Sequence, residues 1–249
     1  MSDMSRSIVR RSSIHSKKCR SRVSTLVYLT MHRMWKELRD IFDTLSSDPT
    51  VRAIILTGAG DRAFTTGLDT KDAAQNGALA PGGPDSDPAR KATHLRRHIE
   101  DFQDCVSALE RCEKPVLCVL HGYSFGLAID IATACDVRIC AEDTKLCVKE
   151  VDIGIAADVG TLSRLPKVVG NYSWVKDVSL SARVFEAEEA LKVGLVSGIY
   201  RGKDAAIQAA LKWASLVAEK SPVAVQGTKR ILDFSRDHTV ANGKLHYQI

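Results

Sequence analysis

Residues 115–140 read PVLCVLHGYSFGLAIDIATACDVRIC, with the pattern of a strand, a turn, a helix and a second strand. The apolar run Pro115–Leu120 predicts a buried strand, and His121-Gly122 predicts a turn. A helix is expected over about 125–135, and Val137–Cys140 predicts the second strand. Strands that alternate with helices are typical of an α/β domain with crossover connections.

The same alternation continues on both sides of this stretch. Further strands are expected at Val51–Thr57, Ala63–Leu68 and Lys145–Lys149. Apolar residues at helical spacing predict helices at Met31–Ser46, Leu95–Leu109, Thr161–Leu165, Ser173–Leu180, Glu186–Val193, Lys203–Glu219 and Pro222–Phe234. Pro166 is expected to stop the helix that begins at Thr161, and Gly77 to Pro88 predicts a loop. One domain is predicted over 31–249.

Composition and charge narrow the function classes. A chain of 249 residues can bury one good core, and no apolar run approaches the roughly 20 residues that span a bilayer. The formal net charge is +5, but the first thirty residues alone hold seven basic side chains and one acid. The remainder is therefore close to neutral, which argues against a nucleic-acid-binding face on the folded body.

The N-terminal segment 1–30 is basic and serine-rich and has no long apolar region. These features predict a disordered or targeting segment, and an organellar transit peptide is favoured over a secretory signal. The last residues, His246-Tyr247-Gln248-Ile249, are not a peroxisomal tripeptide. A mitochondrial or peroxisomal location is expected, and the N-terminal segment favours the mitochondrion.

Seven cysteines are scattered along the chain without a CxxC pair. An odd number without a framework indicates reduced thiols in an intracellular compartment. Most lie in apolar stretches, where they are expected to fill the core. Histidine and cysteine never cluster at zinc spacing, so no metal site is predicted.

Three acidic residues, Asp130, Glu150 and Asp158, each lie among apolar neighbours. Carboxylates in such surroundings lose hydration, which raises their pKa and suits them to move protons near neutral pH. Structural alternatives exist. Asp158 could cap the helix at Thr161, and Glu150 could be a surface residue at the end of a strand.

Two glycine turns form a second feature, FTTGLD at 64–69 and HGYSFG at 121–126. Each could present a backbone N–H to a ligand oxygen, and the second also opens a helix, whose N-terminus favours negative charge. Two such donors would make an oxyanion hole. Glycine turns are, however, more often only turns.

Three stretches, RAFTTGLD at 62–69, HGYSFGLAID at 121–130 and ACDVRIC at 134–140, resemble in order and separation the signature blocks of the crotonase (enoyl-CoA hydratase/isomerase) superfamily. The resemblance runs from about Met34 to Asp237. It implies an α/β fold with a crotonase-like ββα superhelix and flanking C-terminal helices, assembled as trimers or hexamers. It also implies acyl-CoA substrates, so that coenzyme A belongs to the substrate and no separate cofactor is expected.

The block at 148–166, VKEVDIGIAADVGTLSRLP, is similar to that of the Δ3,5-Δ2,4-dienoyl-CoA isomerases of unsaturated fatty acid β-oxidation. This resemblance implies that Glu150 removes the C2 proton of a 3,5-dienoyl-CoA and that Asp158 delivers a proton at C6. Asp130 would then orient or tune Glu150.

The same resemblance assigns the oxyanion donors to the backbone N–H groups of Leu68 and Leu127. Most relatives have three glycines where this chain has Gly126-Leu127-Ala128, so the donor requires a backbone conformation open to leucine.

Other functions stay open at this point. An enoyl-CoA hydratase or a Δ3-Δ2-enoyl-CoA isomerase is the alternative within enzymes. Hydratases resemble one another in having glutamates at positions 130 and 150, so Asp130, together with Asp158, argues against the first. A non-catalytic crotonase-fold subunit is favoured by the ends of the chain. The Asn-Arg-Pro turn of relatives is missing, and the chain stops soon after Phe234.

Overall fold

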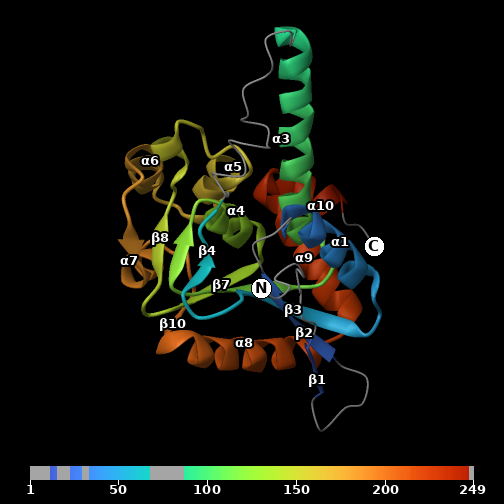
Figure 1. Ribbon diagram of the computed structural model, residues 1–249. Helices are drawn as coiled ribbons and strands as arrows, with labels where there is room; N and C mark the ends of the chain where they lie inside the picture. The colour runs from blue at the N-terminus through green and yellow to red at the C-terminus, as the bar shows by residue number, and fades with distance from the viewer. Residues whose placement is uncertain (1–11, 16–22, 30–33, 68–86, 247–249) are drawn as a thin grey trace, which may run out of the picture.

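The computed structural model describes residues 12–15, 23–29, 34–67 and 87–246. This part of the chain forms two β-sheets with helices packed against them (Figure 1). The larger sheet has the strand order β1-β2-β3-β5-β7-β10. Its strands are β1 (Ser12–His15), β2 (Val23–Leu29), β3 (Val51–Gly58), β5 (Val116–Leu120), β7 (Val137–Ala141) and β10 (Ile199–Tyr200). Strand β1 runs antiparallel to β2, and the other neighbours are parallel.

Parallel strands are joined by crossovers, so both faces of the larger sheet need a cover. Alternate residues of β3 face the two covers: Ala53 and Ile55 belong to one hydrophobic cluster, Ile54 and Leu56 to the other. Helix α8 (Gly202–Ala218) lies along the first face (Figure 1). It packs there through small side chains spaced four apart, Ala206, Ala210 and Ala214.

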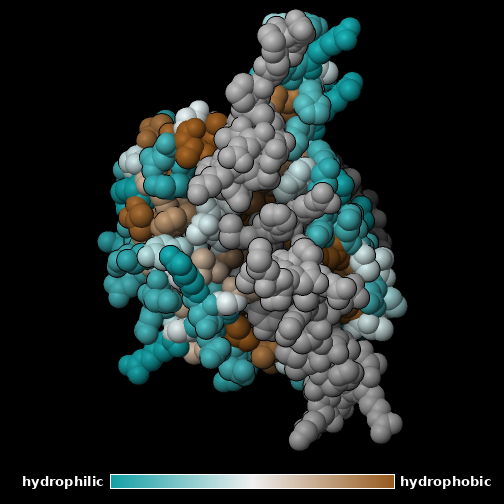
Figure 2. Space-filling model, in the orientation of Figure 1, coloured by the Kyte–Doolittle hydropathy of each residue, from teal (hydrophilic) through white to brown (hydrophobic). Residues whose placement is uncertain are grey.

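The second face of the sheet is covered by one helix that precedes the strands of the smaller sheet and by two that lie between those strands in the chain. They are α1 (Met34–Ser47), α3 (Pro88–Arg111) and α4 (Leu127–Ala134). Their apolar faces share the larger core cluster with β3 and β5. The first half of α3 extends away from the body (Figure 1), and it is hydrophilic on the face seen in Figure 2.

The smaller sheet has the order β4-β6-β8-β9 and consists of β4 (Ala63–Thr65), β6 (Tyr123–Phe125), β8 (Lys145–Cys147) and β9 (Phe185–Glu186). Each of β3, β5 and β7 continues into a strand of this sheet and then into a helical segment. A strand–strand–helix unit therefore recurs three times, as the predicted ββα superhelix requires.

The remaining helical segments follow β8. They are η1 (Glu150–Ile153, a 3₁₀ turn), α5 (Thr161–Val168), α6 (Tyr172–Ser181), α7 (Ala187–Lys192), α9 (Pro222–Arg236) and α10 (Val240–His246). Hydrophobic residues gather on the visible face over α5 and α6 (Figure 2). No helix in the described ranges is long and apolar enough to cross a membrane.

Most predicted helices and strands are confirmed within a few residues, and three expectations are wrong. Ser12–His15 and Val23–Leu29 are strands of the larger sheet, so the expectation of disorder is wrong for these parts of 1–30, while a targeting role of the segment stays a prediction. The strand over 145–149 ends at Cys147. Pro166 lies inside α5, because its fixed φ suits a helix and only one backbone bond is lost.

The short elements β6, β9, β10 and α10 were not expected, since two to seven residues carry little periodicity. The expectation for the cysteines holds. The six in the described residues are free and buried, namely Cys105, Cys112, Cys118, Cys135, Cys140 and Cys147.

Candidate active site

A cavity of about 120 Å³ lies between α3, the start of α4, η1 and the loop before α5. The three carboxylates singled out from the sequence, Asp130, Glu150 and Asp158, all line it. Gly67 and Leu127, from the two glycine turns, line it as well. The fold thus brings together the two features that were separate in the sequence.

The two glycine turns meet because β4 and β6 are parallel neighbours in the smaller sheet. Gly67 (φ 91°) and Gly126 (φ 55°) both have a positive φ, which glycine adopts readily. A Cβ built on Gly67 would lie 3.6 Å from the backbone nitrogen of Leu127. Gly67 therefore lies close to the peptide nitrogen of Leu127, the predicted second donor of an oxyanion hole. Leu68, the predicted first donor, lies outside the described residues.

Leu127 is the first residue of α4, directly after Gly126. In the described residues Ala182 is the one non-glycine residue with a positive φ, so Leu127 has an ordinary helical backbone. The first N–H groups of a helix have no partner within the helix, and they carry the positive end of its dipole. Leucine in place of glycine therefore leaves the backbone donor in place.

Asp130 lies in the first turn of α4 and is 1% exposed. Its Oδ1 accepts a hydrogen bond from the backbone N–H of Thr161 at 2.6 Å, so it caps α5 from another helix. Burial, and secondly the nearby Glu150 carboxylate, raise the pKa of Asp130 to about 7, against the opposing effects of Thr161 and Arg164. Asp130 can therefore change charge near neutral pH.

Glu150 opens η1 and is half-buried. Its Oε2 is buried and has no hydrogen-bond partner within the described part of the chain. A Cβ built on Gly126 would lie 3.2 Å from its Oε1, so the carboxylate lies against the second glycine turn. Burial raises the pKa of Glu150, and the charge of Asp158 adds to this rise. A carboxylate with one unpartnered oxygen is suited to accept a proton there.

Asp158 lines the cavity, but its side chain is exposed, so the predicted loss of hydration is not observed in the free protein. Its backbone carbonyl accepts a hydrogen bond from Nε2 of Gln103, which ties the loop to α3 at 2.8 Å. The alternative role as a helix cap is wrong, because α5 starts after Gly160 and Asp130 supplies the acceptor. The alternative for Glu150 is also wrong, because β8 has ended before it.

The wall of the cavity is apolar. Phe102 of α3 contributes to it, and Trp35 of α1 packs behind Phe102 with ring centroids 4.9 Å apart. Ile153 and Ile155 line the cavity from η1 and the loop after it, and both are exposed. An apolar rim beside a group of carboxylates suits a ligand with an apolar chain and a reactive polar end.

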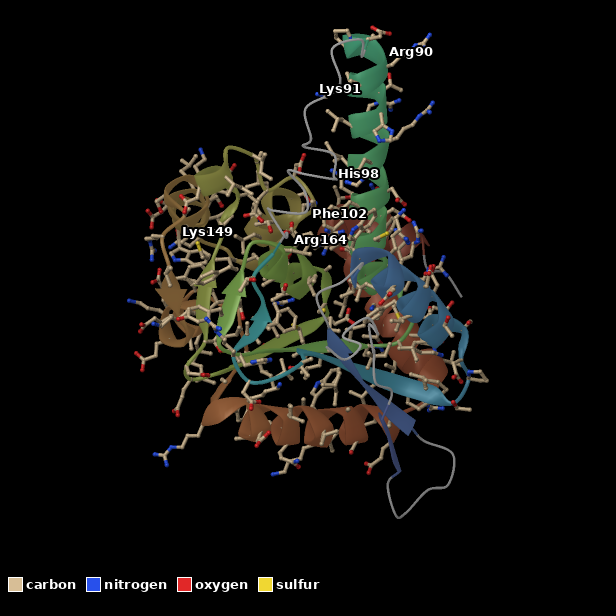
Figure 3. The ribbon with its side chains drawn as sticks, in the orientation of Figure 1. Arg90, Lys91, His98, Phe102, Lys149 and Arg164 are labelled. Atoms are coloured by element: carbon tan, nitrogen blue, oxygen red, sulfur yellow. The ribbon has the colours of Figure 1, made fainter. Side chains whose placement is uncertain are left out.

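Sequence reasoning missed Arg164, which lies within the 148–166 block but was not singled out. It is 8% exposed and forms an ion pair with Glu110 of α3 at 3.0 Å. Figure 3 labels it near the lower part of α3, and its hydrogen bonds to Glu110 and Ser107 join α5 to that helix. The sequence offered one sign of its role, namely that an arginine occupies a position on the buried face of α5. The partner 54 residues away in the sequence was not predictable from spacing.

Within the part of the chain that the structure describes, no group of three or more His, Cys, Asp or Glu side chains is arranged to hold a metal ion. A family model described as enoyl-CoA hydratase/isomerase matches residues 30–244. The chain belongs to the enoyl-CoA hydratase/isomerase family. The match covers the three sequence blocks that carried the resemblance and all the cavity residues.

Two relatives within this family carry the same name. The chain is 47% identical over 207 residues to the human mitochondrial Δ(3,5)-Δ(2,4)-dienoyl-CoA isomerase, and 39% identical over 207 residues to the peroxisomal one of Arabidopsis thaliana. Each match covers 83% of this chain. The chain spans 62% of the length of the human relative and 73% of the Arabidopsis relative.

Solved structures in the family share the fold. The structure of an enoyl-CoA hydratase from Bacillus anthracis superposes with a TM-score of 0.72 at 22% identity. The superposition covers 96% of this chain and 92% of that one. The predicted crotonase-like fold is thus confirmed.

Proposed function

We propose that the protein isomerises 3,5-dienoyl-CoA to 2,4-dienoyl-CoA. The observation that carries the proposal is the meeting of three carboxylates with the N-terminus of α4 in one apolar cavity. The names of the human and Arabidopsis relatives support the same reaction.

The first step requires a weakened C–H bond. The thioester carbonyl would accept hydrogen bonds from the N–H groups of Leu68 and Leu127, and an oxyanion donor is typically worth about 2.7–4 kcal/mol. This stabilises the negative charge that builds on the oxygen when C2 loses a proton. Glu150 has a raised pKa and an unpartnered oxygen, so it is the base that takes this proton.

The second step delivers a proton at the far end of the dienolate. Asp158 would take up a proton from solvent when the substrate binds and give it to C6, and the double bonds move from positions 3 and 5 to positions 2 and 4. Glu150 then holds the C2 proton and Asp158 is ionised. Once the product leaves, Glu150 releases the C2 proton to solvent and the exposed Asp158 takes up another, which restores both groups.

Asp130 does not need to touch the substrate in this scheme. It lies behind Glu150, and its negative charge raises the basicity of Glu150. The apolar residues Phe102, Ile153 and Ile155 would hold the acyl chain and limit access of water to the dienolate. Coenzyme A is part of the substrate, and the scheme needs no metal and no separate cofactor.

We further propose a homo-trimer or hexamer in the mitochondrion or the peroxisome, with the mitochondrion favoured by the basic N-terminal segment. The names of the human and Arabidopsis relatives divide between these two compartments. Light scattering would measure the size of the assembly, and fluorescent fusions of the complete protein would locate it.

The test of the reaction is an ultraviolet assay with a 3,5-dienoyl-CoA, in which the conjugated product appears. We expect absorbance to rise with the wild-type protein and to stay flat with Asp158→Asn. A parallel assay with a 2-enoyl-CoA separates the hydratase alternative, in which conjugation is lost as water adds. A folded protein inactive in both assays would contradict the proposal and favour a non-catalytic subunit.

A further inference from the structure

Arg164 does not itself line the cavity, but it lies near Asp130, which does, and it is fixed by α3. Its Nε donates to Oε2 of Glu110 at 3.0 Å, and one terminal nitrogen donates to Oγ of Ser107 at 2.7 Å. Only 8% of its surface is exposed. A buried guanidinium held by two side chains of another helix has a defined position, so its charge acts on its surroundings in a defined direction.

Asp130 is the carboxylate on the other side of Gly160 from this guanidinium. A Cβ built on Gly160 would overlap the second terminal nitrogen of Arg164 and would lie 3.7 Å from Oδ1 of Asp130. Glycine is therefore required at position 160 because a side chain there would clash with Arg164, and not because of its backbone angles. It allows the cation to approach the carboxylate although the hydrogen bonds of Arg164 go to α3.

The charges around Asp130 come from three elements. Glu150 of η1 is the like charge, and Arg164 of α5 is the opposite charge. On α3, Glu110 is bonded to Arg164. Strands β4 and β6 also pack on α4 and carry no acidic or basic side chain in their sequences AFT and YSF, apart from the phenol of Tyr123. The charge of Asp158 raises the pKa of Glu150 and is not among the charges that shift the pKa of Asp130.

We propose that Arg164 is a positioning residue that keeps a shared proton off the Asp130–Glu150 pair at and above neutral pH. Two buried carboxylates that repel each other tend to hold one proton between them. Glu150 can take the C2 proton of the substrate only when that shared proton is absent. The inference rests on the proposed function for its catalytic meaning, but the charge relation itself does not depend on it.

A purely structural role would have a different signature. Glu110 is already paired with Arg236 of α9 through its other oxygen, so it keeps one cation when Arg164 is removed. Arg236 therefore offers a matched control. Arg236→Gln removes the other cation bound to Glu110, and Arg236 does not face Asp130 across Gly160. Both variants should lower stability, but only the loss of Arg164 should change the charge state of Asp130.

The experiment is a carboxyl-carbon NMR titration of protein labelled at aspartate, with Asp130→Asn to assign the signal. We expect Arg164→Gln to raise the pKa of Asp130 by about one unit, the lower end for an opposite charge within a few ångströms. Arg236→Gln should leave it unchanged. Glu110→Gln should lower it, because Arg164 then has one anion less to balance. That opposite shift decides the matter if Arg164→Gln does not fold.

Enzyme kinetics supply the second readout. The acid limb of the kcat profile should move to higher pH in Arg164→Gln by the shift that NMR measures, with little change in KM. Arg164→Lys should restore part of the shift. An unchanged Asp130 titration in folded Arg164→Gln would overturn the inference. A shifted titration in a protein that isomerises no dienoyl-CoA would instead reject the proposed function and leave the charge relation standing.

Discussion

An acid lies at each end of helix α4, Asp130 buried and Asp136 half-buried, and the two acids have different partners. Asp130, in the first turn, accepts one backbone hydrogen bond and faces another carboxylate, while the nearest cation is bonded elsewhere. Asp136, two residues past the last turn, accepts bonds from the N–H of Val116 at 2.7 Å and from Nζ of Lys229 at 2.9 Å.

Burial raises the pKa of both acids, but Lys229 bonds directly to Asp136 and opposes the rise there. The same lysine also donates to the carbonyl of Lys114, so it joins α9 to the body of the protein. A paired buried acid fixes structure, whereas an acid left beside a second carboxylate keeps a charge that can change. The N-terminal end of α4 is therefore the reactive end, and the C-terminal end is the structural one.

The largest expected effect comes from Glu150→Gln at the reactive end. Loss of the base should lower kcat by about 10³-fold, within the usual range for acid–base catalysis, because Glu150 is the carboxylate that lies against Gly126. The melting temperature should not fall, since Oε2 has no hydrogen-bond partner in the described residues to lose. Activity above a tenth of the wild-type value would show that another group is the base.

Asp130→Asn should make the protein more stable at high pH. The pKa of Asp130 is raised from 3.8 to about 7, so the folded protein binds a proton more readily than the unfolded chain. The stability that this proton adds is fully present below about pH 4 and is lost as the pH rises through about 7. At 1.36 kcal/mol per pKa unit, the ionised acid costs on the order of 4 kcal/mol at pH 8.

Urea unfolding at pH 4 and pH 8 measures this difference. The variant should match wild type at pH 4, exceed it at pH 8, and turn over substrate more slowly because Glu150 becomes a weaker base. Equal stabilities at both pH values would mean that Asp130 is not held in the unfavourable charged state described above.

Lys229→Met, at the structural end of α4, should lower stability and leave activity nearly unchanged. It leaves Asp136 half-buried without its cation, and breaking a buried ion pair costs about 3 kcal/mol or more. Activity per folded molecule should remain close to wild type, because the pair does not contact the cavity residues. The double variant Asp136→Asn/Lys229→Met should recover part of the loss in the same urea experiment.

The smallest expected effect is that of Gly126→Ala. A positive φ of 55° costs an alanine about 1–2 kcal/mol, and the new Cβ would lie 3.2 Å from the Glu150 carboxylate. Stability should fall by that amount, and kcat should fall more than KM rises, because the base and the donor at Leu127 are both displaced. Gly170→Ala is a suitable control, since a Cβ there meets no atom within 4 Å.

Periodicity was enough to predict the strands and helices that build the core. The apolar runs that begin at Val51 and Pro115 correspond to β3 and β5, both in the larger sheet. The strand Val23–Leu29 was missed, because the charge of the whole segment 1–30 outweighed its short apolar pattern. The average composition of a thirty-residue segment can therefore mask a seven-residue strand within it.

The site was predictable only in part. The three carboxylates were singled out by their apolar neighbours and given their roles by the family resemblance, since nothing in their spacing places Asp130 beside Glu150. The exposure of Asp158 was missed because apolar neighbours in sequence, such as Ala157, do not fix where its side chain lies. Arg164 was missed because its role depends on α3, which is distant in the sequence.

The central claim is that two different carboxylates handle the two protons, and turnover of 3,5-dienoyl-CoA in D₂O tests it most directly. Because Asp158 is exposed and exchanges with solvent, we predict one deuterium at C6 of the 2,4-dienoyl-CoA product, measured by mass spectrometry and proton NMR. A product without deuterium at C6 would contradict the account, because a single group would then have carried the same proton from C2 to C6.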